Sequence, residues 1–154
     1  VRALGVEYAI IGHNERVEKY HENKSIVNMK LIAALEANIL PILCFGENID
    51  EDYKEVIPKI LDAYLKDVLN IDFITFAYAI CTGTLPSVDR IKEVTGFISK
   101  YIEDKYHKKP SIIYGGSVDS SNIDEIINIE RLSGVMIGAI SSNIKEIQKI
   151  FKNI

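Results

Sequence analysis

Two short polar clusters combine residue types that handle protons and phosphate groups. The first is Gly12-His13-Asn14-Glu15-Arg16, and the second is Tyr114-Gly115-Gly116-Ser117-Val118. Each cluster directly follows a run of apolar residues that is typical of a buried strand. In α/β barrels the chemistry lies at the C-terminal ends of parallel strands. The two clusters are therefore predicted to form one site around a histidine and a phosphate.

His13 is expected just past a strand end, where the following polar residues open a helical turn. The dipole at a helix N-terminus disfavours added positive charge, so the neutral imidazole is favoured there. A neutral imidazole can donate a hydrogen bond to a carbonyl group and polarise it. The alternative is a histidine that only caps a loop. Glu15 and Arg16 are adjacent, so their side chains diverge, and each is expected to pair with another residue and hold the loop.

The second cluster is suited to phosphate because its two glycines let the backbone turn sharply and expose N–H groups. The hydroxyl of Ser117 adds a donor. Gly138-Ala139 ends a later strand, and Ser141-Ser142 precedes the last helix. Because barrels often bind phosphate with the loops after their last strands, this second loop is also a candidate phosphate site. The alternatives are an ordinary βα turn for the first loop and, for the second, a strand exit with Ser142 as a helix cap.

Other reactive residue types show no catalytic pattern. Thr82-Gly83-Thr84 follows a strand and could be a lid with a glycine hinge, and it lacks the lysine of a P-loop. Cys44 is expected in the core, whereas Cys81 is expected to be exposed in its loop without a base beside it. His21 and His107 stand among charged residues and are expected to be solvated. No grouping has metal-ligand spacing.

Five short apolar runs predict strands buried on both faces. They are residues 7–12, 40–46, 73–78, 111–115 and 134–139. Helical patterns fill the intervals between these strands. The apolar positions of the predicted helices are Ile26, Met29, Ala33 and Leu35 in the first, residues 56–69 around Pro58 in the second, 91–102 in the third, Ile126 and Ile127 in the fourth, and 144–151 in the last. Ser121 and Asp124 resemble a capping box before the fourth helix. This alternation predicts a parallel sheet covered by helices. The pattern fits either a small doubly wound sheet or part of an eight-stranded barrel.

Composition is that of an ordinary globular domain, with 154 residues and 47% hydrophobic residues. The net charge of −4 argues against a nucleic-acid partner. No apolar run is long enough to span a bilayer and no signal peptide is visible, so no membrane partner is expected. Two cysteines favour a reducing cytosol. A helical pattern is already under way at Val1, which predicts that the chain starts inside a domain.

The motifs together resemble one family, the triosephosphate isomerases. Residues 4–16 resemble the family's fourth strand and loop, with Asn14 where the family usually has serine. Residues 42–47 resemble the fifth strand, 79–83 the tip of the sixth loop, 112–118 the seventh strand and loop, and 134–139 the eighth strand. These matches are collinear and cover the whole chain.

The resemblance implies a (β/α)8 barrel of the α/β class, with residues 1–154 as its C-terminal portion and with strands equivalent to the fourth to eighth. It implies a cytoplasmic homodimer without metal or organic cofactor that interconverts dihydroxyacetone phosphate and glyceraldehyde 3-phosphate in glycolysis and gluconeogenesis. His13 would be the electrophile and Glu15 a supporting residue. The substrate phosphate would be bound by main-chain N–H groups at Cys81, Ser117, Gly138 and Ala139.

The departures from the family affect catalysis directly. The family reads Ala-Tyr-Glu-Pro-Val-Trp-Ala-Ile-Gly-Thr-Gly after its sixth strand, whereas this chain passes from Tyr78 to Ala79, without the glutamate base. Asp72 and Asp89 are poorly placed to replace it. Cys81 and Ala139 stand where glycines are usual. The family's first three βα units, which carry its Asn and Lys, are also absent. We therefore expect reduced or no isomerase activity. Both outer strands of the sheet would be open edges, so we also expect the chain to fold poorly alone.

Two other hypotheses stay open at this point. The chain could be a non-catalytic remnant or fragment that binds phosphate or pairs with another barrel segment. It could also be a different phosphate-binding barrel enzyme, because that fold hosts many chemistries. The Gly12-to-Arg16 segment speaks against the second hypothesis, because fold analogy alone would not supply it.

Overall fold

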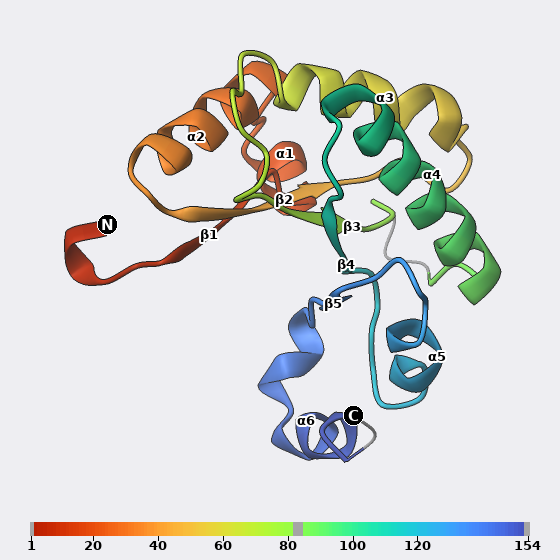
Figure 1. Cartoon of the computed structure of the whole chain (residues 1–154). Coiled ribbons are helices and arrows are strands. Elements are labelled where there is room, and N and C mark those ends of the chain that lie inside the picture. The colour runs from red at the N-terminus through yellow and green to blue at the C-terminus, as the bar shows by residue number, and fades with distance from the viewer. Residues whose placement is uncertain (1, 82–84, 153–154) are drawn as a thin grey trace.

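The fold is one curved sheet of parallel strands with helices packed on its outer side (Figure 1). The computed structural model describes residues 2–81 and 85–152, so the predicted lid at 82–84 lies outside the described residues. The strands are β1 (Tyr8–Ile11), β2 (Leu40–Phe45), β3 (Thr75–Tyr78), β4 (Ser111–Tyr114) and β5 (Gly134–Val135). All neighbouring pairs run parallel.

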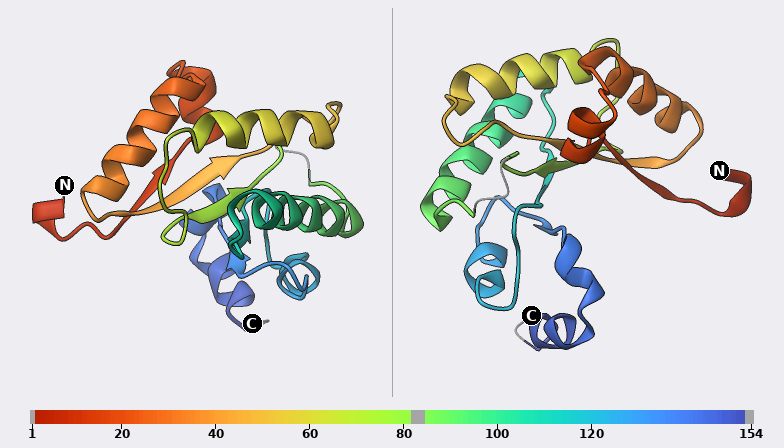
Figure 2. Two further views of the ribbon diagram at one scale, coloured as in Figure 1. Left: turned by 45° about the horizontal axis from the view of Figure 1, so that its top comes forward. Right: turned by 180° about the vertical axis from the view of Figure 1, so that it is seen from behind.

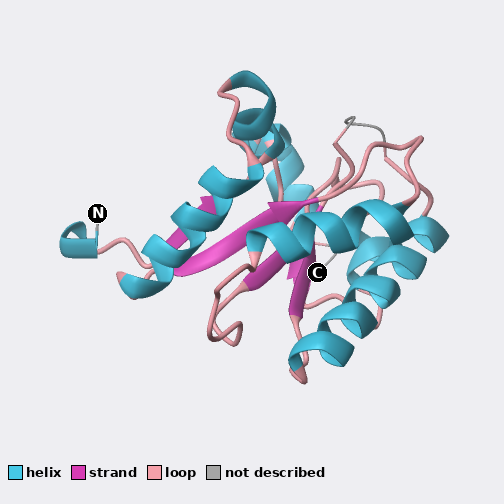
Figure 3. Ribbon diagram, turned by 90° about the horizontal axis from the view of Figure 1, so that it is seen from above, coloured by secondary structure: helices cyan, strands magenta, loops and turns pink. Residues whose placement is uncertain are grey.

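Helices occupy the connections between the strands, as the sequence pattern predicts. They are α1 (Asn14–Lys19), α2 (Lys24–Glu36), α3 (Tyr53–Tyr64), α4 (Val88–Tyr106), α5 (Ile123–Ile127) and α6 (Ile144–Ile150), with short 3-10 turns η1 (Arg2–Leu4) and η2 (Ala139–Ser142). Figures 2 and 3 show α2, α3 and α4 lying over one face of the sheet. Figure 2 also shows α5 and α6 beyond β4.

The strand order decides between the two architectures that the sequence left open. The strands lie in the order β1-β2-β3-β4-β5, which is their order along the chain. A doubly wound sheet reverses its order at a switch point, and helices then cover both of its faces. A consecutive order with helices on the outer face is the arrangement of a barrel. Within the described residues, β1 and β5 pair on one side only, so both are sheet edges, as predicted.

The core lies between the convex face of the sheet and the helices that cover it. Leu43 of β2 and Phe76 of β3 are fully buried, as are Ile57 and Leu61 of α3, which belong to the same hydrophobic cluster. The concave face is open at β1, where the side chains of Tyr8 and Ile10 are 57% and 56% exposed. Burial of these apolar side chains therefore holds each helix against the sheet on one side only.

The strand predictions are correct in number and direction, and the main error is at the last strand. The sequence predicted a strand over 134–139, but β5 covers only Gly134–Val135. The reason is the neighbouring strand, since β4 ends at Tyr114, which pairs with Val135. One more bond follows, from Met136 N to the carbonyl oxygen of Tyr114 at 2.8 Å. Beyond it the chain pairs with no further strand among the described residues and turns into η2.

Two helix predictions were wrong in detail. In α2 the sequence favoured a face containing Met29 and Ala33, but both are exposed and the buried residues are Val27, Leu31 and Ala34. The predicted capping box before α5 is also absent. Asp119 replaces it, because its carboxylate accepts from the main-chain N–H and the hydroxyl of Ser121.

The helix after β2 contains Pro58 in its interior, where the sequence suggested a start or a kink. It begins earlier, at a cap formed by Asp52, whose carboxylate accepts from Lys54 N at 2.9 Å. It also ends earlier than the apolar pattern predicts, at Tyr64, and Leu69 beyond it is fully exposed.

The exits of β2 and β3 approach each other so closely that only glycine fits between them. Ala79 N donates to the carbonyl oxygen of Phe45 at 3.0 Å, which extends the sheet by one bond beyond the strands. A methyl group on Gly46 would overlap the carbonyl oxygen and carbon of Ala79, which are backbone atoms. The side-chain-free residue at position 46 therefore allows the two strand exits to meet.

The Gly46→Ala variant is expected to lose about 1–3 kcal/mol of unfolding free energy, because the backbone at Ala79 must move to relieve the overlap. The matched control is Gly96→Ala in the middle of α4, where an added methyl group meets no atom within 4 Å. That variant is expected to gain about 0.5–1 kcal/mol from helix propensity. Urea denaturation measures both, and equal stability of the two variants would contradict the close approach.

Candidate functional site

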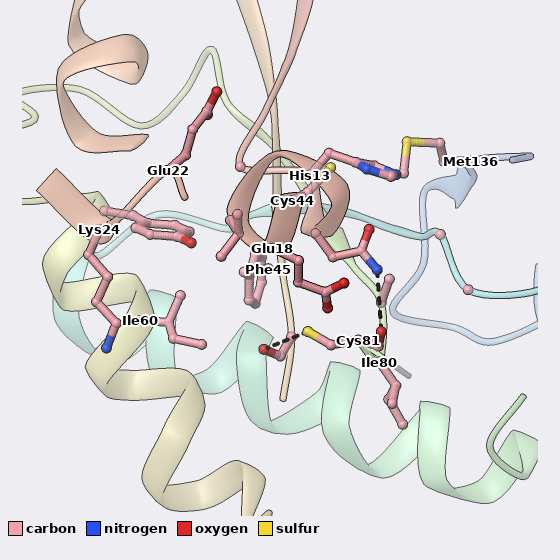
Figure 4. Close-up of a pocket in the computed structure, with 18 of the residues that line it drawn as sticks. His13, Glu18, Glu22, Lys24, Cys44, Phe45, Ile60, Ile80, Cys81 and Met136 are labelled. Atoms are coloured by element: carbon pink, nitrogen blue, oxygen red, sulfur yellow. Dashed lines mark hydrogen bonds between the residues drawn. The ribbon is translucent and has the colours of Figure 1, made fainter. Parts of the chain in front are cut away.

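A cavity of about 630 Å³ opens at the C-terminal ends of the strands (Figure 4). Both polar clusters from the sequence line it. His13 comes from the β1 exit, Cys81 from the β3 exit and Ser117 from the β4 exit, and Ala139 follows β5. The structure thus brings together four of the predicted site residues. Gly138 is not among the residues that line this cavity, and neither is Glu15.

His13 lies at the start of α1 and is its N-cap. Its Nδ1 accepts a long hydrogen bond of 3.4 Å from Glu15 N. The same N–H also donates to Asn14 Oδ1 at 3.0 Å. A ring nitrogen that accepts carries no proton, so the bond to Nδ1 assigns a ring proton to Nε2. The ring extends toward Met136 across the cavity (Figure 4). The cap and the cavity contact thus use different ring nitrogens, so the capping alternative and a chemical role are compatible.

The charged residues after His13 pair as the sequence predicted, although Glu15 pairs within its own helix. The Glu15 carboxylate accepts from Lys19 Nζ at 2.6 Å. Arg16 reaches the carboxylate of Glu22 at 2.6 Å, and Lys30 Nζ lies 2.5 Å from the same oxygen. Glu22 is buried, and these hydrogen bonds, led by that from Lys30, lower its pKa. Glu22 therefore ties the segment after α1 to α2.

Cys81 is half-buried, in contrast to the exposed position expected from the sequence. Its N–H donates to the carbonyl oxygen of Glu47 at 3.1 Å, and its thiol lies 3.6 Å from the carbonyl oxygen of Gly46. Asn14 Nδ2 donates to the Cys81 carbonyl oxygen at 3.4 Å, which links α1 to the β3 exit. Burial, followed by the charge of Glu18, raises the pKa of the Cys81 thiol, so the thiol stays protonated at neutral pH.

The glycine-rich loop after β4 is tied to its surroundings at both ends. Gly115 N donates to the carbonyl oxygen of Tyr78 at 2.9 Å, and Asn122 Nδ2 donates to the carbonyl oxygen of Ser117 at 2.9 Å. A methyl group on Gly116 would come within 2.5 Å of the hydroxyl oxygen of Tyr114. Ser117 has a φ of 49°, a left-handed conformation that is uncommon for a residue other than glycine. Such conformations concentrate at functional sites.

The segment after β5 turns away from the sheet immediately beyond the strand. Gly138 precedes η2, and its carbonyl oxygen accepts from Ser141 N at 2.9 Å. Ser142 does not cap the last helix, since its hydroxyl donates to the carbonyl oxygen of Ala139. Asn143 caps α6 instead, by accepting from Lys145 N and Glu146 N.

A buried ionic network lies beneath the β2 and β3 exits. The fully buried carboxylate of Glu47 pairs with Arg90 of α4 at 3.0 Å and accepts from the hydroxyl of Tyr78 at 3.1 Å. Burial, together with the nearby Glu47 charge, raises the pKa of the phenols of Tyr78 and Tyr114. In the sequence Glu47 appears only as an acidic residue after a strand, and its partner Arg90 lies 43 positions later, so spacing could not reveal the pair.

Several cavity residues were not predicted to belong to the site. Glu18, Glu22 and Lys24 contribute charge, and Tyr64 and Met136 contribute apolar surface. Periodicity could have found Glu18, because it follows Asn14 by one helical turn. Among residues 2–81 and 85–152, no group of His, Cys, Asp and Glu is arranged to hold a metal ion. In the same ranges, no helix combines the length and apolarity needed to cross a membrane.

Comparison with known proteins identifies the family. The family model for triosephosphate isomerase matches residues 1–154. The chain belongs to the triosephosphate isomerase family. It is 36% identical to the triosephosphate isomerase of Mycoplasma mobile over 97% of this chain and 63% of that protein. It is 35% identical to the triosephosphate isomerase of a Wolbachia species from Brugia malayi over 100% of this chain and 65% of that protein.

The fold comparison gives the same result. The crystal structure of triosephosphate isomerase from Bartonella henselae matches with a TM-score of 0.87 and 27% sequence identity, covering 99% of this chain and 66% of that chain. The predicted partial (β/α)8 barrel is therefore confirmed. The chain spans about two thirds of the length of the triosephosphate isomerases it matches.

The Glu22 carboxylate is expected to make stability depend on acidity. Its pKa is lowered in the folded state, so its contribution is present above the ordinary value of 4.5 and is lost as the pH falls through the lower folded value. The Glu22→Gln variant should lose about 1 kcal/mol at neutral pH and show a shallower decline below pH 4.5. Urea denaturation across this range measures both effects, with the exposed Glu36→Gln of α2 as the control. Parallel acid declines in wild type and Glu22→Gln would contradict this role.

Proposed function

We propose that this protein is a triose-phosphate isomerase that interconverts dihydroxyacetone phosphate and glyceraldehyde 3-phosphate through an enediolate. The observation that carries the proposal is the shared cavity, in which the Nε2 side of His13 and the glycine-rich loop after β4 face one space. A carbonyl compound with a phosphate at its other end needs both features at once. Membership of the triosephosphate isomerase family supports this substrate class.

His13 is proposed as the electrophile. With Nδ1 accepting from Glu15 N, the ring presents Nε2–H as a donor. A donor aimed at the substrate carbonyl stabilises the negative charge that develops on its oxygen when the adjacent carbon loses a proton. The same nitrogen can pass its proton between the two substrate oxygens. Glu15 is proposed to support this step indirectly, because its main chain orients the ring while its carboxylate pairs with Lys19.

The phosphate group is proposed to bind between the loops after β3, β4 and β5. Ser117, with its left-handed backbone, belongs to a glycine-rich turn that can direct successive N–H groups at an anion. Ala139 and Cys81 line the same cavity. Gly138, which adjoins Ala139, is proposed to contribute its N–H. Binding of one phosphate by these three loops is supported by their position, because they leave the C-terminal ends of the adjacent strands β3, β4 and β5.

The proposal extends to the wider setting of the protein. Residues 1–154 are proposed to be the C-terminal portion of one barrel domain, with strands equivalent to the fourth to eighth. The complete protein is proposed to be a homodimer in the cytoplasm that acts in glycolysis and gluconeogenesis, without a cofactor. Family membership supports these statements.

A second candidate function is phosphate binding without catalysis. The specific observation in its favour is the β3 exit, where Ala79 directly follows Tyr78 and supplies no carboxylate at this point of the cavity. Binding of inorganic phosphate by a protein without measurable turnover of dihydroxyacetone phosphate would favour this candidate over the isomerase.

The His13→Asn variant tests the electrophile. Asparagine retains a side-chain oxygen that can cap α1, so the helix should persist, but the donor at Nε2 is removed. We expect kcat for isomerisation to fall by about 10²- to 10³-fold. Affinity for inorganic phosphate, measured by calorimetry, should stay unchanged because the phosphate loops are intact. An unchanged kcat would contradict the proposed role of His13.

A further inference from the structure

The proposed isomerisation needs a group that removes a proton from the carbon beside the substrate carbonyl. A carboxylate can do this if it reaches the cavity and is not already held by cations. The carboxylates that line the cavity in the described part of the chain are Glu18 and Glu22. Glu22 is buried between Arg16 and Lys30, and these partners lower its pKa, so it is a weak and immobile base.

Other nearby carboxylates are also excluded by their positions. Glu15 does not line the cavity and pairs with Lys19. Glu47 is fully buried beneath the strand exits, where it pairs with Arg90 and accepts from Tyr78. In contrast, Glu18 makes no ion pair or hydrogen bond with any part of the chain that the structure describes. It is the lining carboxylate that remains free to accept a proton.

The position of Glu18 in α1 directs it toward the β3 exit. Asn14 and Glu18 are four residues apart, so they lie on the same side of the helix. Asn14 on this side donates to the carbonyl oxygen of Cys81 at 3.4 Å. Figure 4 shows the Glu18 carboxylate pointing toward Cys81, and its charge is the largest charge contribution raising the pKa of the Cys81 thiol. Glu18 therefore reaches the cavity wall where β3 ends.

We propose that Glu18 is the catalytic base of this protein, delivered by the short helix that follows His13 and not by the β3 exit. The inference rests on the isomerase function proposed above. It places the electrophile and the base on one continuous segment, residues 13–18, so that a single element sets their relative position. The exposed carboxylate of Glu18 can approach a substrate whose carbonyl oxygen contacts His13.

The proton and electron balance of the step is simple. The Glu18 carboxylate takes the proton from the carbon beside the carbonyl, and the electron pair of that C–H bond forms the carbon–carbon double bond of the enediolate. The carbonyl oxygen takes the negative charge and is stabilised by Nε2–H of His13. His13 Nε2 then gives its proton to this oxygen and takes the proton of the hydroxyl on the neighbouring carbon, so that the negative charge moves to that second oxygen. As the second oxygen becomes the new carbonyl, the electron pair of the carbon–carbon double bond takes the proton back from Glu18 at the former carbonyl carbon, which completes the isomerisation and regenerates the carboxylate. No oxidant, reductant or cofactor is required.

The test compares wild type with Glu18→Gln in the full chain. Glutamine keeps the size of the side chain but cannot accept the proton, so kcat should fall by about 10²- to 10⁴-fold with little change in KM. Deuterium uptake from D₂O into dihydroxyacetone phosphate should fall in parallel, and the acid limb of the kcat/KM profile should disappear. Glu18→Asp should retain part of the activity. The control is Glu55→Gln, an exposed glutamate of α3 outside the cavity, which should leave all of these quantities unchanged.

The outcomes separate the two proposals. Loss of turnover and of deuterium uptake in Glu18→Gln, with partial retention in Glu18→Asp, supports the assignment. If wild type isomerises the substrate and Glu18→Gln does so equally well, Glu18 is not the base and the isomerase function still stands. If wild type catalyses neither isomerisation nor deuterium uptake while it binds inorganic phosphate, both proposals are overturned.

Discussion

The structure depends on hydrogen bonds that continue between the strands after the strands themselves have ended. Ala79 N bonds to the oxygen of Phe45, Gly115 N to that of Tyr78 and Met136 N to that of Tyr114, at 2.8–3.0 Å. These bonds carry the parallel register into the first residues of each loop. The loops after β2 to β5 therefore leave the sheet side by side, and the polar residues that follow converge on one cavity.

This arrangement leaves charged groups near the sheet, and the structure pairs most of them. The buried carboxylate of Glu47 has Arg90, and Glu22 has Arg16 and Lys30. Removing one member of such a pair leaves an uncompensated charge, which is costly when it is buried. Glu18 differs because it faces the cavity without such a partner. An unpaired carboxylate is costless at an exposed position and is useful where a proton must be accepted.

Much of the fold and part of the site could be predicted from the sequence. The five strands were identifiable because each is a short apolar run bounded by polar or glycine residues, and His13 and Ser117 were identifiable because they follow such runs. The order of the strands in the sheet could not be predicted, because periodicity carries no information about which strands are neighbours. The length of β5 could not be predicted either, because it depends on where the neighbouring strand β4 ends. The pair of Glu47 and Arg90 depends on contact between residues distant in sequence.

The placement of Glu18 shows a second limit of sequence reasoning. A search for a replacement base near Tyr78 considers Asp72 and Asp89, which are close in sequence but do not line the cavity. Glu18, the lining carboxylate without a cationic partner, precedes Tyr78 by 60 positions and comes from α1, across the exit of β2. Neighbouring exits of a parallel sheet bring such residues together, and the same convergence unites His13 with the glycine-rich loop.

The central claim is that His13 and the loop after β4 bind one ligand in one cavity. Nitrogen-15 NMR of the protein titrated with dihydroxyacetone phosphate tests it most directly. We expect the Nε2 resonance of His13 and the amide resonance of Ser117 to shift together and to give the same Kd. A response at only one of these positions, or two different Kd values, would contradict it.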